Sequence, residues 1–197
     1  DTPRATFPPP IAAWRDEALT LADEYNNPAT FERAATLAWT QAQVQLRHLG
    51  MDLDEAHLFQ DLASQILYLD PTLRPSSAVL TRNTRGPSAL WGHGISGDIP
   101  IVLVRIDAAE DQDLIRQLLP ADEYWRMKQL AVDLVIQNEQ TSSYAQQDLQ
   151  TWLEAQLRMS QSRARHEGHA PHGSVFLLRA DLMSDEDRTL LQTAARA

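Results

Sequence analysis

Acidic and amide side chains follow three short apolar runs in the sequence, at 101–106, 132–137 and 174–179. They are Asp107 after the first run, Asn138 and Glu139 after the second, and Asp181 after the third. If the runs are parallel strands, their carboxyl ends meet at the sheet edge where open α/β sheets bind ligands. Paired carboxylates at this edge could work as general acid and base. They could equally cap and favour the helices that follow, so both interpretations stay open.

A glycine-rich loop at 86–98 places an indole among short polar groups. Its candidate residues for ligand or interdomain contact are Trp91, His93, Ser96 and Asp98. A tryptophan in such a loop can stack on a sugar ring, or it can anchor the loop by packing inside the protein. We expect the anchor role, with Trp91 buried in the seam between the helical arm and the α/β domain described below.

Metal and cofactor sites are not predicted. The chain has no cysteine, so thiolate sites are excluded. His166, His169 and His172 are spaced by three, but Gly168 and Pro171 disfavour the helix that would align them, and we expect a solvated loop. The phosphate-binding loop, dinucleotide fingerprint and nucleophile elbow motifs are absent from the sequence.

Composition narrows the class of protein and of partner. The 197 residues suit one domain with a helical extension. A net charge of −10 disfavours nucleic acid and anionic lipid as partners. No apolar run approaches the roughly 18 residues that cross a bilayer, so we expect no direct membrane insertion by this segment. The chain does not begin with Met, and we expect a fragment.

Helical spacing dominates residues 1–70, which we assign to a helical arm or linker after an extended, proline-rich start. Asn27 and Pro28 predict a helix start, and Gly50 predicts its end. Apolar residues on more than one side predict that this helix is covered on more than one side. Residues 71–100 form an irregular connecting segment, with a short helix near 76–82.

Residues 101–197 read as a small α/β domain. The three apolar runs predict strands, and the stretches between and after them predict helices at 109–130, 144–160 and 184–197. Pro120 is expected to split the first of these helices into two pieces. Strands that alternate with helices predict a mainly parallel sheet of three or more strands flanked by helices, so the fold class is α/β with an N-terminal helical arm.

Several long blocks of the sequence resemble the cyclic β-1,2-glucan synthases. These blocks lie at 31–49, 90–104, 123–128, 132–139 and 173–181. The resemblance implies a piece of a very large bacterial inner-membrane protein with many membrane spans. Such a protein has a glycosyltransferase part and a C-terminal part similar to cellobiose phosphorylase, of glycoside hydrolase family 94. It also implies a location on the cytoplasmic side of the membrane.

The same resemblance transfers no catalytic residue to this chain. The family's transferase motifs and the barrel with the phosphorylase-like catalytic acid are absent here, so the isolated chain is expected to be inactive. We expect a non-catalytic module that positions the glycosyltransferase and phosphorylase-like domains, with other domains of the same synthase as partners and β-1,2-glucan as a further candidate. The alternative is a small carbohydrate-binding or enzymatic α/β domain that uses the acidic sheet edge.

Overall fold

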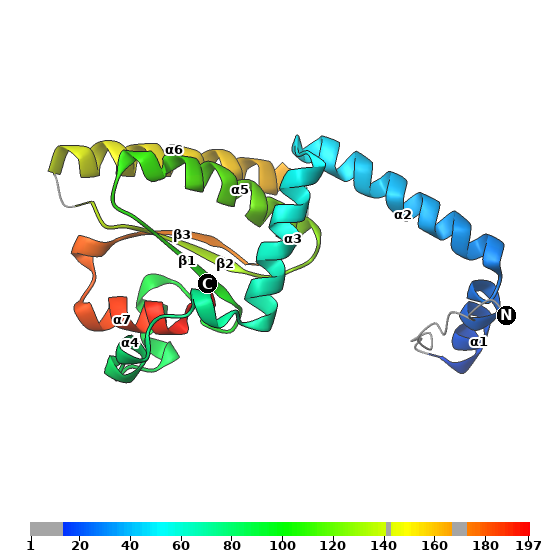
Figure 1. Cartoon of the computed structure of the whole chain (residues 1–197), viewed down its shortest axis with the longest axis horizontal. Helices are drawn as coiled ribbons and strands as arrows, with labels where there is room; N and C mark the ends of the chain where they lie inside the picture. The colour runs from blue at the N-terminus through cyan, green and yellow to red at the C-terminus, as the bar shows by residue number, and fades with distance from the viewer. Residues whose placement is uncertain (1–13, 141–142, 167–172) are drawn as a thin grey trace. The chain divides into compact units, whose positions relative to one another are not determined.

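The computed structural model describes residues 14–140, 143–166 and 173–197 (Figure 1). They belong to two compact units, Asp1–Asp52 and Leu53–Ala197. The helix that starts at Leu53 and the segment 71–100 are therefore in the same compact unit as the sheet. The sequence analysis divided the chain at residues 70 and 100 into an arm, a connecting segment and a domain. As a division into functional parts, this remains a prediction. The proline-rich start lies outside the described residues.

The described part of the first unit contains two helices, α1 (Arg15–Tyr25) and α2 (Pro28–Leu49). The Asn27 side chain accepts a hydrogen bond from the Ala29 amide at 3.0 Å, and Pro28 occupies the first turn of α2. Gly50 ends the helix in the left-handed conformation at φ 67°. The predicted start and stop of α2 are thus confirmed. Its predicted coverage is not found, because none of its residues is buried within the chain.

A three-stranded parallel sheet in the order β1-β2-β3 organises the described part of the second unit. The strands are β1 (Ile101–Ile106), β2 (Asp133–Asn138) and β3 (Val175–Arg179). Leu103 pairs with Val135, and Val135 pairs with Phe176. The predicted α/β class, with a parallel sheet flanked by helices, is confirmed.

Helices cover both faces of the sheet. In Figure 1, α5 and α6 lie above it, while α4 and α7 lie below. Their bounds are α4 (Ser77–Arg82), α5 (Gln112–Met127), α6 (Ser143–His166) and α7 (Asp185–Ala194). Short 3₁₀ turns complete the unit: η1 (Pro71–Leu73), η2 (Pro87–His93), η3 (Ala109–Asp111) and η4 (Ala180–Leu182). None of the helices in the described ranges is both long enough and apolar enough to cross a bilayer.

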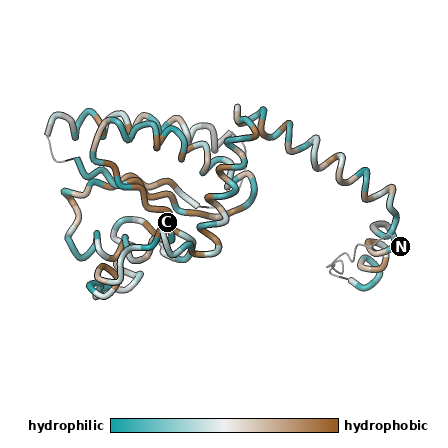
Figure 2. Tube along the Cα trace, in the orientation of Figure 1, coloured by the Kyte–Doolittle hydropathy of each residue, from teal (hydrophilic) through white to brown (hydrophobic). Residues whose placement is uncertain are grey.

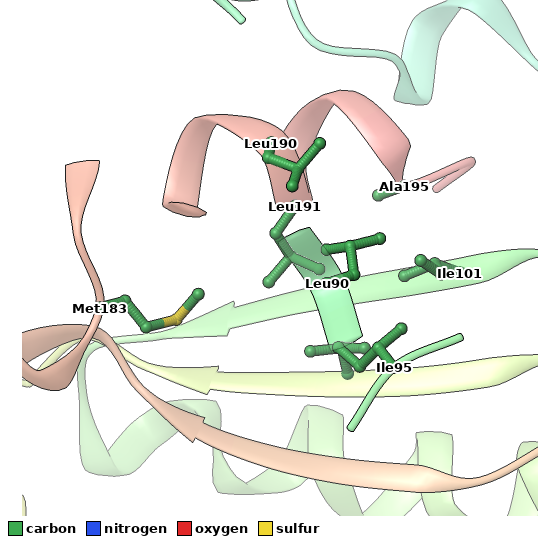
Figure 3. Close-up of a cluster of buried hydrophobic side chains, with 8 residues drawn as sticks. Leu90, Ile95, Ile101, Met183, Leu190, Leu191 and Ala195 are labelled. Atoms are coloured by element: carbon green, nitrogen blue, oxygen red, sulfur yellow. The ribbon is translucent and has the colours of Figure 1, made fainter. Parts of the chain in front are cut away.

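A buried cluster joins the sheet to α7 and to the segment before β1, on the face of the sheet that α7 covers (Figure 3). Leu90 and Ile95 come from that segment, and both are fully buried. They pack with Ile101 of β1, Val135 of β2 and Leu191 of α7. Figure 2 shows the strands as hydrophobic (brown), as expected for a sheet covered on both faces.

The helix α3 (Leu53–Tyr68) packs against α5. The Trp125 indole nitrogen donates to the Phe59 carbonyl at 2.8 Å, and the Gln60 amide donates to the Tyr124 hydroxyl at 2.7 Å. Trp125 is fully buried, so its one polar atom has a partner where water is excluded. These contacts make α3 part of the core of the second unit.

Pro120 does not split the helix before β2, so this prediction is wrong. The helix α5 runs from Gln112 to Met127 with Pro120 inside it. Proline removes one helical hydrogen bond, but Leu119, Ala121 and Trp125 beside it are buried. Burial of this apolar face favours the continuous helix more strongly than proline opposes it.

The last residues of the chain form hydrogen bonds to β1 along the edge that does not pair with β2. The Arg196 amide donates to the Ile101 carbonyl at 2.8 Å, and the Leu103 amide donates to the Ala197 carbonyl at 2.7 Å. Arg74 fixes the same stretch by donating to the carbonyls of Ala195 and Thr193. A cation at the C-terminal end of α7 also complements its dipole.

One carboxylate is buried in the layer that covers the upper face. Asp122 of α5 is 1% exposed and forms an ion pair with Arg126, one turn later. Burial raises the pKa of Asp122 to about 6, because loss of hydration outweighs the attraction of Arg126. The folded chain therefore holds this proton more tightly than the unfolded chain does.

Val135→Asp should unfold the second unit. Val135 is fully buried in the central strand, and an unpaired buried carboxylate costs several kcal/mol against a total stability of about 5–15 kcal/mol. Thermal melting followed by circular dichroism tests this. Leu182→Asp, at an exposed position, is the control and should melt like the parent. A Val135→Asp variant with the parental melting temperature would contradict the assigned burial.

The free energy of unfolding should fall with rising pH because of Asp122. The protonated Asp122 carboxyl contributes its full share to the free energy of unfolding below the ordinary pKa of 3.8. This contribution is lost as the pH rises through the folded-state pKa of about 6. The difference amounts to on the order of 3 kcal/mol. Asp122→Asn keeps an acceptor for Arg126 but removes the proton, so its unfolding free energy should depend less on pH between 4 and 7. Urea titrations of both proteins measure this, and parallel pH profiles would refute it.

Candidate functional site

A pocket of about 560 Å³ opens at the carboxyl edge of the sheet. Residues 82–84, at and after the end of α4, form one wall. Arg105 and Glu139 contribute from the ends of β1 and β2, and α7 contributes Asp185, Glu186 and Arg188 from its first turns and Gln192 from its last turn. The pocket thus lies where α/β folds place ligands.

Arg105 and Glu139 form a two-point ion pair in this pocket. Arg105 Nε donates to Glu139 Oε1 at 2.7 Å, and Nη2 donates to Oε2 at 2.9 Å. These hydrogen bonds raise the pKa of Arg105 above its ordinary value. The Arg105 side chain is 51% exposed and the Glu139 side chain 23%, and both line the pocket. Two parallel hydrogen bonds hold both groups in one plane.

The start of α7 adds charge of both signs. Arg188 forms an ion pair with Asp185 one turn earlier, and Glu186 lies beside them. Three arginines (Arg82, Arg105 and Arg188) and three carboxylates (Glu139, Asp185 and Glu186) therefore line the pocket. The formal charges balance, and the acids at the first turn of α7 offset the positive end of its dipole.

Of the four edge residues proposed from the sequence, Glu139 alone lines this pocket. Asn138 is fully buried, and its side chain donates to Gln150 of α6. Asp181 forms an ion pair with Arg179, whose hydrogen bonds lower the pKa of that carboxyl. Asp107 is exposed beyond β1, and its backbone amide donates to the Asp111 carboxylate. Ligand contact by these residues remains a prediction.

Trp91 does not anchor its loop, so that prediction is wrong. Its side chain is 68% exposed, and its indole nitrogen donates to the Ser96 carbonyl at 3.1 Å. The neighbours Leu90 and Ile95 are the buried anchors instead. Gly94, at φ 77°, allows the tight reversal that turns both of them inward.

The other loop candidates make local contacts. Ser96 Oγ accepts a hydrogen bond from the Asp98 amide at 3.2 Å, and the Asp98 side chain is exposed. His93 Nε2 lies 3.7 Å from Asp187 Oδ2, on α7. Arg85 and the Ser184 hydroxyl also contact Asp187, and the Ser184 hydrogen bond lowers the pKa of that carboxyl most. These contacts tie the loop to the start of α7.

Several pocket residues were not proposed from the sequence. Arg105 is the charged residue within the apolar run 101–106, and a guanidinium near the end of a strand is a usable signal. Gln192 and residues 82–84 carry no such signal, because their place in the pocket depends on how α4 and α7 pack.

Metal ligation has no support in the described ranges, where no group of His, Asp or Glu side chains is arranged to hold an ion. The histidine cluster proposed from the sequence is not part of this finding, since His169 and His172 lie outside the described residues.

Comparisons with known proteins identify a relative. No family model matches the chain. The cyclic beta-(1,2)-glucan synthase NdvB of Rhizobium meliloti is 39% identical to it over 175 residues, or 89% of this chain. The match spans 6% of the length of that synthase. The resemblance seen in the sequence blocks is thus confirmed, and the chain is homologous to a short segment of a cyclic β-(1,2)-glucan synthase.

Proposed function

We propose that the chain is a non-catalytic module of a cyclic β-1,2-glucan synthase. In this role it positions the glycosyltransferase and phosphorylase-like domains of that protein on the cytoplasmic side of the bacterial inner membrane. Its partners are other domains of the same synthase. The homology supports a role in such a synthase, and the positioning role rests on the surface of α2.

The observation that carries this proposal is the exposure of apolar side chains along α2. Leu37, Trp39 and Val44 are 69%, 68% and 61% exposed, on a helix of 22 residues without a buried position. Leu37 and Val44 are seven residues apart and share one side of the helix, whereas Trp39 lies on the other. Exposed apolar side chains that share one side of a helix, as Leu37 and Val44 do, are typical of protein–protein contact sites.

The chemistry of the pocket also favours a non-catalytic role. Its carboxylates Glu139 and Asp185 are held by arginines rather than paired with each other. The carboxyl group with the strongly raised pKa, Asp122, does not line the pocket. A catalytic acid is expected to combine a raised pKa with access to substrate, and these properties occur here in different residues.

A second candidate function is carbohydrate binding, or an enzymatic activity, at the acidic sheet edge. The pocket beside Glu139 favours its binding form. The two functions are compatible, because a positioning module can also hold a segment of the glucan.

Leu37→Glu together with Val44→Glu should abolish most synthase activity without unfolding the chain. Both side chains are exposed in the chain, so its melting temperature should change by no more than a few degrees. In the full-length synthase, two charges on an apolar contact should lower cyclic glucan production at least fivefold. The assay measures cyclic glucan made by membranes that contain each variant.

The matched control is Thr36→Glu together with Gln43→Glu. It adds the same charge at the same spacing on another side of α2. The control should produce cyclic glucan at the parental rate. Parental activity of the Leu37/Val44 variant, or an equal loss in the control, would rule out a contact at this side of the helix.

A further inference from the structure

We propose that the pocket at the carboxyl edge of the sheet binds a neutral polyhydroxyl ligand, namely a short segment of β-1,2-linked glucan. The choice of this sugar rests on the proposed function, whereas the site itself rests on the geometry of the pocket. The site requires no contact by α2, so the two proposals can fail separately.

The charges of the pocket select against an ionic ligand. Arg105 is held by Glu139, and Arg188 is held by Asp185. An anion would have to displace these carboxylates to pair with Arg105 or Arg188. Arg82 also lines the pocket, and its charge is balanced there by Glu186 at the start of α7. A cation would meet the arginines. A neutral ligand avoids both costs.

The fixed Arg105–Glu139 pair matches the hydrogen-bonding needs of a sugar. Nε and Nη2 of Arg105 are used by Glu139, which leaves the Nη1 hydrogens for a ligand. The carboxylate keeps lone pairs beyond the two it uses. A hydroxyl group both donates and accepts, so neighbouring hydroxyls can bond to the two groups together. The ion pair holds both groups in place before the ligand arrives, which lowers the entropic cost of binding.

Two amide side chains have unused hydrogen-bonding groups, one in the pocket and one in the core beside Arg105. Gln192 lines the pocket half-buried, and its side chain makes no hydrogen bond within the described ranges. Gln137 pairs in register with Arg105 and precedes Glu139 by two residues. It is fully buried, its Nε2 contacts only the Met183 sulfur, and its Oε1 accepts no hydrogen bond. Buried polar atoms normally have partners, so this oxygen is an unused acceptor in the core beside Arg105, although Gln137 itself does not line the pocket.

The volume fits a small ligand. Pockets for small molecules usually measure roughly 300–1,000 Å³, and this one measures about 560 Å³.

The test is a titration of the folded chain with sophorose and with longer linear β-1,2-glucooligosaccharides, followed by calorimetry and by NMR of the Arg105 side-chain NεH. We expect saturable binding that shifts this signal. Arg105→Gln and Gln192→Leu should each weaken binding at least tenfold. Arg179→Gln is the matched control, because it breaks an Arg–Asp pair at the end of β3 outside the pocket, and it should bind like the parent. Thermal melts establish that all three variants are folded.

Three results would overturn the site. They are no saturation by any of the oligosaccharides, an equal loss of affinity in the Arg179→Gln control, or tighter binding of inorganic phosphate than of the sugars. Equal affinity for cellobiose would retain the polyhydroxyl site but refute its selectivity for the β-1,2 linkage. If the sugars fail to bind while the α2 variants still reduce glucan production, the positioning function stands without this site.

Discussion

The complete burial of β2 is the constraint on which the second unit depends. All six residues of this strand are buried, three of them with polar side chains. A strand without exposure needs a neighbour on each side and a helical layer on each face. The segment before β1 is drawn into the core for the same reason, since Leu90 and Ile95 complete the layer that α7 begins.

The polar residues of β2 form hydrogen bonds that position the elements around this strand. The Asp133 carboxylate accepts from the Ser174 amide at 3.0 Å, which fixes the start of β3, and Asn138 donates to Gln150, which fixes α6. Each of these groups would be costly to bury without its partner. Gln137 has one atom without a partner, and it lies next to the residues that line the pocket. The buried oxygen that lacks a hydrogen bond therefore lies near the pocket at the sheet edge.

Local sequence patterns predicted most helices and strands. The features that they did not predict depend on three-dimensional packing. The strands followed from short apolar runs, and Asn27 and Gly50 marked the ends of α2 through their own capping preferences. The predictions for Pro120 and Trp91 were wrong because each considered one residue without the packing of its neighbours. A proline can stay in a helix whose face is buried, and a loop can be anchored by the aliphatic neighbours of its largest residue. For the pocket, sequence reasoning reached Glu139 from its position after a strand but could not supply the residues that α4 and α7 bring beside it.

The two units differ in what stabilises them, and this difference bears on the proposed role. The second unit has a closed core of strands and helices, whereas α2 buries no residue. Most helical stability in proteins comes from packing of an apolar face. Burial of a large apolar side chain such as Leu37 or Val44 on a partner would contribute about 1.5–3 kcal/mol. A partner domain would therefore stabilise the helix that binds it.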